Sequence, residues 1–372
     1  MQEKCDDAAA IAAKSWRVRK LRILRLVVAY IRQAGGWNKA FPPEGGVYEC
    51  DFNLDTKDDA WIEQHLRFRR HEIPIVIKAM RIPKWVCTSN RDACHRDLAF
   101  IMLLFKMSWP RRLIDFALEF GGNGARSMRI CNALTVLLYH KYHKKMEELD
   151  RERLTDEYIL EMCRIQFEKF GTCPHVWGFI DATVRPCCRP VYFQEAIYNG
   201  KDRVHAIKFQ TIVSVDGMIC HCSGPWSGRR HDSYLYNKTL PRVLADLPII
   251  IADDGETPLP VAVYADPGYV LSTRVLMPFP DGRTDAVHCA FNRTMSRARI
   301  TVEWGYGRVT QLFKHLVFKD NLKVFKSPIG AQYFVGVLLT NAKTCVDGGN
   351  NVSDYFGCCP PNVCDFFKTL AD

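Results

Sequence analysis

Two short apolar runs of the chain each lead to an aspartate. Residues 176–180 are followed by Asp181, and residues 261–265 are followed by Asp266. A short continuous apolar run is typical of a strand that is buried on both faces, as in a sheet covered by helices. The chain is therefore predicted to have an α/β fold in which two buried strands deliver acidic side chains to a sheet edge.

A third acid, Glu303, lies in a different setting. It belongs to the run 294–304, which contains no Gly or Pro and favours a helix. Carboxylates are the hard oxygen ligands that Mg²⁺ or Mn²⁺ prefers, and a cluster of them leaves positions open for water and phosphate. Asp181, Asp266 and Glu303 are therefore the candidate catalytic and metal-binding residues.

Each of these acids also has a simpler interpretation when taken alone. Asp181 with Thr183 fits a turn cap, and Asp266 before Pro267-Gly268 fits an ordinary turn. Glu303 fits a solvated helix residue. Only the combination of the three acids in their separate settings favours a metal site.

The region around the acids alternates predicted strands and helices from 170 to 345. A long strand over 205–215 turns at Val215-Asp-Gly-Met218 and returns as a hairpin through 219–222. A helix over 233–245 follows, which Pro241 breaks or ends, and the strand leading to Asp266 comes next. The predicted order is strand, hairpin, helix, strand and then the helix that carries Glu303.

Five segments together resemble the DDE transposases of the PIF/Harbinger group, over about residues 60–360. In chain order they are Phe179-Ile-Asp-Ala-Thr183, Tyr198-Asn-Gly-Lys201, Gly228-Arg-Arg-His-Asp232, Ala265-Asp-Pro-Gly-Tyr269 and Ser296-Arg-Ala-Arg-Ile-Thr-Val-Glu303. The resemblance implies an RNase H-like DDE nuclease core, for which the predicted element order is suitable. It departs from many relatives at Ala182 and in Ala265-Asp-Pro-Gly268, while the carboxylates are retained.

The resemblance also implies roles for the acids. Asp181 would bridge two divalent ions, Mg²⁺ or Mn²⁺, while Asp266 and Glu303 would each bind one of them. Two such ions about 4 Å apart activate the attacking water or DNA 3′-hydroxyl and stabilise the leaving oxygen. His231 and Asp232 match a His-Asp pair of the family and are second-rank candidates. Asp232 also fits a helix N-cap.

The segment before the core is predicted to be helical. Residues 111–120 and 125–139 form two predicted helices joined by Gly121-Gly-Asn-Gly124, which is the outline of a helix-turn-helix. Arg126 and Arg129 lie near the start of the second helix and are candidate DNA-binding residues. The pattern alone favours an ordinary packed helix pair. The resemblance, whose family often carries such a module here, makes the two interpretations equally compatible.

Charge favours a polyanionic partner, since the formal net charge is +10 and the pI about 8.9. Lys201, Arg203, Arg229 and Arg230 are further candidate DNA-binding residues near the core, although surface charges have the same pattern. Residues 14–33 show a basic amphipathic helical pattern. Its basic face fits a solvated surface, phosphate contact or a nuclear localisation signal.

The remaining features concern compartment and domains. Acids stand in residues 1–13, where a signal peptide needs a basic start and an apolar stretch, so the sixteen cysteines are expected to be reduced, intracellular thiols. The resemblance to DNA transposases implies a nuclear location. Cys220-His-Cys222 and Cys358-Cys359 with Cys364 suggest zinc only weakly. No run of eighteen apolar residues occurs, so no membrane partner is expected.

Four regions are predicted: a basic N-terminal segment (1–57), a helical candidate DNA-binding domain (58–168), the RNase H-like DDE catalytic domain (169–345) and a C-terminal tail (346–372). The favoured function is a metal-dependent DNA endonuclease and strand transferase of a cut-and-paste transposon. The alternatives are a domesticated nuclease or DNA-binding regulator derived from one, and a scaffolding protein with a vestigial metal site. The resemblance further implies DNA, a Myb-like accessory protein and a homo-oligomer as partners.

Overall fold

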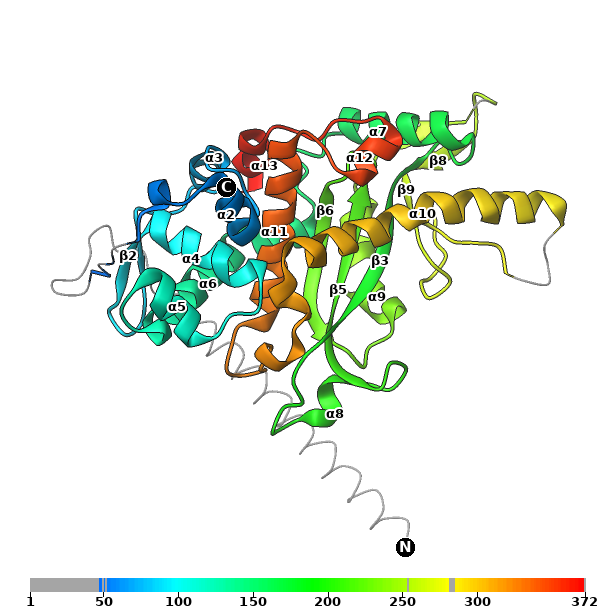
Figure 1. Cartoon of the computed structure of the whole chain (residues 1–372). Helices are drawn as coiled ribbons and strands as arrows, with labels where there is room; N and C mark the ends of the chain where they lie inside the picture. The colour runs from blue at the N-terminus through cyan, green and yellow to red at the C-terminus, as the bar shows by residue number, and fades with distance from the viewer. Residues whose placement is uncertain (1–46, 49, 51, 253, 281–284, 371–372) are drawn as a thin grey trace, which may run out of the picture.

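The computed structural model describes residues 47, 48, 50, 52–252, 254–280 and 285–370 (Figure 1). The basic pattern predicted over 14–33 lies outside these residues. No helix among the residues described is both long and apolar enough to span a membrane.

A mixed sheet lies at the centre of the chain (Figure 1). Its central strand β3 (Val176–Pro186) is antiparallel to β5 (Val204–Ser214) on one side and parallel to β9 (Ala262–Tyr264) on the other. The sheet continues through the antiparallel β6 (Ile219–Ser227) beyond β5 and the parallel β10 (Val275–Leu276) beyond β9, and β4 (Tyr198–Asn199) pairs with the start of β5. The predicted α/β class is confirmed.

Helices cover this sheet. The helix α7 (Asp156–Phe170) packs against β3, and α10 (Ala286–Leu312) begins beyond the sheet and then crosses β3 and β5, as Figure 1 shows. Next to β6 lie α11 (Ile329–Asp347) and the long α6 (Gly124–Glu148). The short α12 (Asn351–Phe356) contacts α7 and α10, and α13 (Val363–Leu370) contacts α3, α6 and α11. The segment predicted as a tail therefore contains two packed helices.

The region before the sheet is mainly helical. It contains η1 (Leu54–Thr56), α2 (Asp59–Leu66), α3 (Glu72–Ala79), α4 (Arg96–Ser108), α5 (Leu113–Phe120), α6 and a small hairpin of β1 (Trp85–Cys87) and β2 (Ala93–His95). One hydrophobic core runs from Tyr48 to Leu370 and joins this region to the sheet. Because α6 packs on both α4 and β6, the predicted boundary at 168 is not marked by a gap in the core.

Two local predictions need correction. The strand predicted to end before Asp181 continues to Pro186, because β5 pairs with β3 as far as Pro186 opposite Ala206. Pro241 does not end α9 (Asp232–Ala245), because Leu240, Val243 and Leu244 are buried and hold its last turns in place. The predicted hairpin of β5 and β6 is confirmed, as is the helical setting of Glu303.

The other elements are short. A two-stranded hairpin of β7 (Ile249–Ile251) and β8 (Pro258–Pro260) precedes β9. The one-turn helix α8 (Gln194–Ile197) precedes β4, and the 3-10 turns η2 (Lys314–Val317) and η3 (Lys319–Asn321) connect α10 to α11. The helix α8 lies at the end of the β3–β5 ladder farthest from Val176. The end of η3 adjoins this region, because the Cys188 amide donates a hydrogen bond to the Leu322 carbonyl.

Candidate active site

Asp181 and Asp266 lie on neighbouring strands. Phe179 of β3 pairs with Tyr264 of β9 in the parallel register, and each aspartate follows its strand's paired residue by two positions. Adjacent strands are about 4.8 Å apart, so this register brings the two carboxylates near each other. Asp181 is 19 % exposed, and Asp266 accepts a hydrogen bond of 3.0 Å from the Gly268 amide.

Asp232, the second-rank candidate, joins this pair. A Cβ placed on Gly268 would lie 3.1 Å from Asp266 Oδ1 and 3.6 Å from Asp232 Oδ2, so both carboxylates flank the same glycine. Asp232 is the first residue of α9, and its Oδ1 accepts a 2.9 Å hydrogen bond from Lys208 Nζ on β5. The side chain of Lys208 is only 10 % exposed. The N-cap residue is His231, which makes no capping hydrogen bond through its side chain.

Glu303 reaches the cluster through an arginine. Arg299 lies one turn before Glu303 on α10, and its guanidinium is 3.3 Å from Glu303 Oε1 and 3.6 Å from Asp181 Oδ2. The side chain of Glu303 is 55 % exposed, whereas that of Arg299 is 26 % exposed. Arg299 therefore links two of the three predicted acids.

Two buried tyrosines, Tyr306 and Tyr269, lie next to the acid cluster. The Tyr306 hydroxyl donates a 2.6 Å hydrogen bond to the carbonyl of Asp181 and accepts one from Thr211. The Tyr269 hydroxyl accepts a hydrogen bond of 3.2 Å from Gln210 Nε2. Burial raises the pKa of both tyrosines, and the nearby Asp181 raises it further. Both phenols therefore stay neutral near neutral pH.

The surroundings also act on Asp181 itself. Burial is the main cause that raises the pKa of its carboxyl to about 6, and the charges of Asp266 and Asp232 add to the rise. The Ala182 amide, which donates a 2.7 Å hydrogen bond to Oδ1, and the charge of Arg299 oppose it. A buried carboxylate beside two others is a strained arrangement that a bound cation would relieve.

The donor set fits a hard divalent cation, since all four side chains offer carboxylate oxygens. Within the described residues, however, no three His, Cys, Asp or Glu side chains lie close enough together to hold a metal ion. Two of the acids are held apart or occupied by cations: Arg299 lies between Asp181 and Glu303, and Lys208 pairs with Asp232. The four side chains therefore suit a divalent cation by their chemistry and by lying in one region, but they are not arranged around a common metal position.

The predicted DNA-binding residues near the core lie at the surface. Lys201 and Arg203 are exposed in the turn between β4 and β5. Arg229 is exposed between β6 and α9, and the guanidinium of its neighbour Arg230 lies 4.3 Å from the centre of the Tyr234 ring. None of these four forms an ion pair within the described part of the chain.

Arg126 and Arg129 have a different environment. The two predicted helices exist as α5 and α6, joined by a glycine turn. Arg126 and Arg129 lie 3.0 and 2.8 Å from the carboxylate oxygens of the largely buried Asp92. Both arginines are therefore paired with a carboxylate of the same chain, and insertion of α6 into a DNA groove stays a prediction.

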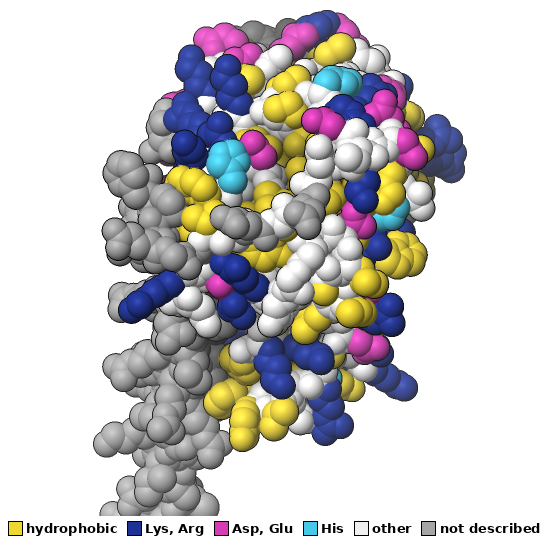
Figure 2. Space-filling view, turned by 60° about the vertical axis from the view of Figure 1, so that its left-hand side comes forward, with side chains coloured by type: hydrophobic (Ala, Val, Ile, Leu, Met, Phe, Trp, Pro, Cys, Tyr) yellow, Lys and Arg dark blue, Asp and Glu magenta, His cyan; other side chains and the backbone are white. Residues whose placement is uncertain are grey.

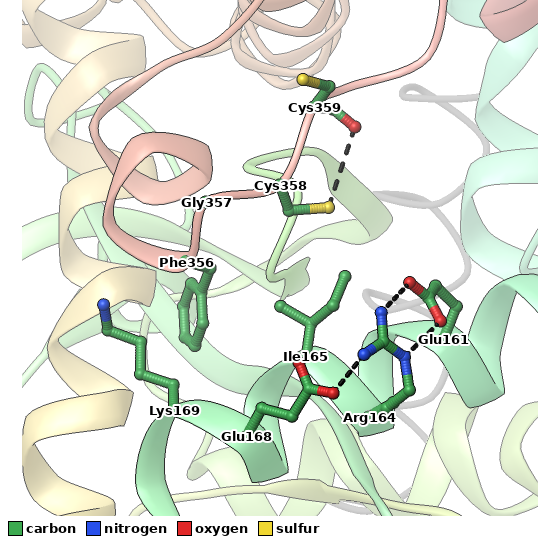
Figure 3. Close-up of a pocket in the computed structure, with 9 residues that line it drawn as sticks. All are labelled: Glu161, Arg164, Ile165, Glu168, Lys169, Phe356, Gly357, Cys358 and Cys359. Atoms are coloured by element: carbon green, nitrogen blue, oxygen red, sulfur yellow. Dashed lines mark hydrogen bonds and ion pairs between the residues drawn. The ribbon is translucent and has the colours of Figure 1, made fainter.

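A surface pocket lies elsewhere (Figure 3). It is formed by one side of α7 and by residues 356–359, which begin at the last residue of α12. Arg164 in its wall donates hydrogen bonds to Glu161 and Glu168. None of the candidate acids lines it. The cysteines that the structure describes, including Cys358 and Cys359 at this pocket, are free thiols.

Residues 180–341 match the family model of the DDE superfamily endonucleases. The match covers less than half of the 372 residues, but it includes Asp181, Asp232, Asp266 and Glu303. It indicates a transposase-type nuclease domain, for which DNA is the implied substrate. No curated protein and no solved structure matches the chain significantly.

Sequence interpretation missed the two cations of the site. Arg299 stands four residues before Glu303, which is the spacing of an ion pair on one helix face, so a signal was present. Lys208 is a charged residue in the middle of the buried strand β5, and such a residue requires a partner. Its partner Asp232 is the first residue of α9. The pair therefore depends on how α9 is placed relative to β5, which local sequence does not show.

Proposed function

We propose that the chain is a metal-dependent DNA endonuclease and strand transferase of a cut-and-paste transposon, of the PIF/Harbinger type. The observation that carries this proposal is that Asp181 and Asp266 follow paired positions of the neighbouring strands β3 and β9. Asp232 flanks Gly268 together with Asp266, and Arg299 links Glu303 to Asp181. The family match over the same residues supports it.

An RNase H-like core is part of this proposal. Its support is the strand order β6, β5, β3, β9, β10, in which β5 is antiparallel to β3 and to β6, while β9 and β10 run parallel to β3. A helix bearing Glu303 follows the strands and packs on β3. This order and these directions agree with what such a core requires.

Asp181, Asp266 and Glu303 would together hold two Mg²⁺ or Mn²⁺ ions. Asp232, the second-rank candidate from the sequence, would join this set because it flanks Gly268 together with Asp266. The chemistry that these ions supply when bound is activation of a water or DNA 3′-hydroxyl and stabilisation of the leaving oxygen. The residues of this chain hold the carboxylates in position: Tyr306 through the Asp181 carbonyl, and Gly268 through the Asp266 carboxylate.

The wider setting is also proposed. A transposase works in the nucleus on the ends of its element, and the resemblance implies a homo-oligomer and a Myb-like accessory protein as partners. The net charge of +10 supports a polyanionic partner.

The test is Mn²⁺-dependent cleavage of DNA that carries the ends of the encoding locus. The wild-type protein is compared with Asp181→Ala, Asp266→Ala and Glu303→Ala, with and without a Myb-like protein encoded nearby. We expect each substitution to lower the cleavage rate by about 10³-fold or more, while circular dichroism shows unchanged folding. Cleavage that persists in all three variants would overturn the assignment.

A further inference from the structure

A lobe of mixed aromatic and basic character lies beyond the far end of β3. We define it as residues 189–203, which include α8 and β4, and residues 317–326, which include η3. The two segments adjoin: the Cys188 amide donates a 3.0 Å hydrogen bond to the Leu322 carbonyl, and the rings of Phe193 and Phe325 lie 6.4 Å apart. Beneath them Cys187, Leu322 and Ile329 form a small hydrophobic cluster separate from the main core.

Large apolar side chains of this lobe lie at the surface. Tyr192 is 70 % exposed, and Tyr198 and Phe325 are each 40 % exposed. Val191 and Phe318 beside them are exposed as well. Single exposed apolar residues are normal on a soluble protein, but a group of them marks an interaction surface.

The same two segments carry six exposed cations: Arg189, Lys201, Arg203, Lys319, Lys323 and Lys326. The exposed acids of the lobe are Glu195, Asp202 and Asp320, so positive charge dominates. Within the described part of the chain none of the six forms an ion pair. Figure 2 shows hydrophobic and basic side chains together at the lower end of the described residues, where Figure 1 places α8.

Exposed aromatic rings flanked by unpaired cations suit single-stranded nucleic acid. Bases stack on the rings without sequence preference, while the cations contact successive phosphates. Duplex DNA hides its base faces and offers only phosphates to the same surface. We infer that this lobe is a binding surface for single-stranded DNA outside the acid cluster.

The position of the lobe relates it to the cluster. Pro186 is the last residue of β3 and lies just before the lobe in the chain. It is five residues from Asp181 along this strand, so about 17 Å separates the two residues. A single strand of a few nucleotides can cover that distance. This inference rests on the proposed function only in taking DNA as the ligand, and it adds a site for a strand that leads to or from the acids.

The experiment measures fluorescence anisotropy of a labelled twenty-nucleotide oligo(dT), and of a duplex of equal length, in EDTA. Cleavage plays no part in this assay, so it reports on the lobe whether or not the acids are catalytic.

We expect Tyr192→Ala and Phe325→Leu each to weaken oligo(dT) binding by about 10-fold and duplex binding by less than about 2-fold. Tyr192→Phe keeps the ring and is expected to bind as wild type. The pair Lys323→Gln with Lys326→Gln should reduce the slope of log affinity against log salt by about 1.4. Matched controls are Trp109→Ala, an aromatic residue 54 % exposed elsewhere, and Lys144→Gln, an exposed cation of α6.

Unchanged oligo(dT) affinity in both Tyr192→Ala and Phe325→Leu would overturn the inference. If the same variants instead abolish self-association in sedimentation measurements, the lobe is a protein interface. Equal losses for oligo(dT) and duplex would also overturn it, because the surface would then bind phosphates alone.

Discussion

The acid cluster and the aromatic–basic lobe lie on the same strand pair but use their cations in opposite ways. In the cluster, Lys208 and Arg299 are mostly buried and pair with carboxylates. In the lobe, Lys323, Lys326 and their neighbours are exposed and form no ion pair among the described residues. A net charge of +10 therefore says little about DNA binding until the structure separates paired cations from available ones.

The largest difference between the two regions is expected for substitutions of their acids, Asp232 in the cluster and Asp320 in the lobe. Because its carboxylate flanks Gly268 together with Asp266, we expect Asp232→Asn to lower Mn²⁺-dependent cleavage by about 10² to 10³-fold. Asp320→Asn, which changes an exposed acid of the lobe, should leave the rate within about 2-fold. Similar rates for both variants would return Asp232 to a purely structural role at the start of α9.

Removing a buried cation should cost stability, whereas removing an exposed one should not. Lys208→Met leaves Asp232 without its partner, and we expect the free energy of unfolding to fall by about 1 to 3 kcal/mol. Lys323→Gln is expected to change it by less than about 0.5 kcal/mol. Urea unfolding of both variants at pH 7 measures the difference, and equal values would contradict the contrast between paired and available cations.

Asp181 should destabilise the metal-free protein at neutral pH. Its pKa of about 6 lies above the ordinary 3.8, so the unfolded chain ionises first as pH rises. The free energy of unfolding then falls between these two pH values and stays lower above them. In EDTA at pH 7.5, Asp181→Asn should be more stable than wild type by about 1 to 3 kcal/mol.

The check on this prediction is a pH series of thermal unfolding. The gain of Asp181→Asn should shrink toward zero below about pH 4. Adding Mn²⁺ should stabilise the wild type more than the variant. A gain that does not vary with pH would show that the carboxylate's ionisation is not its cause.

The smallest effect is expected at the start of α6. Burial alone would raise the pKa of Asp92, but hydrogen bonds from Arg129 and Thr88 and the charges of both arginines lower it overall. Arg129→Gln should therefore reduce the free energy of unfolding by about 1 kcal/mol at pH 7, and less as pH falls through the titration of Asp92.

The affinity for duplex DNA tests whether Arg129 also contacts DNA. We expect Arg129→Gln to weaken duplex binding by less than about 2-fold in the anisotropy assay. A loss of 10-fold or more would favour the helix-turn-helix prediction over an internal role.

Local sequence patterns were sufficient for several elements. Apolar runs indicated the strands that carry Asp181 and lead to Asp266, and Val215-Asp-Gly-Met218 indicated the hairpin of β5 and β6. These signals are local because strand burial and turn conformation depend on neighbouring residues. They failed at the far end of β3 and at Pro241, where pairing with β5 and burial of α9 outweighed local preference.

The sequence by itself was sufficient to predict the α/β class and the local settings of the three candidate acids. Asp181 lies on a strand, Asp266 follows one, and Glu303 lies on a helix. Only the tertiary structure decided which charges meet: Arg299 with Asp181 and Glu303, Lys208 with Asp232, and Arg126 and Arg129 with Asp92. It also brought residues 189–203 and 317–326 together into one exposed lobe. Most of these partners stand 24 or more positions apart in the chain, so their pairing follows from strand register and helix packing, which no local pattern encodes.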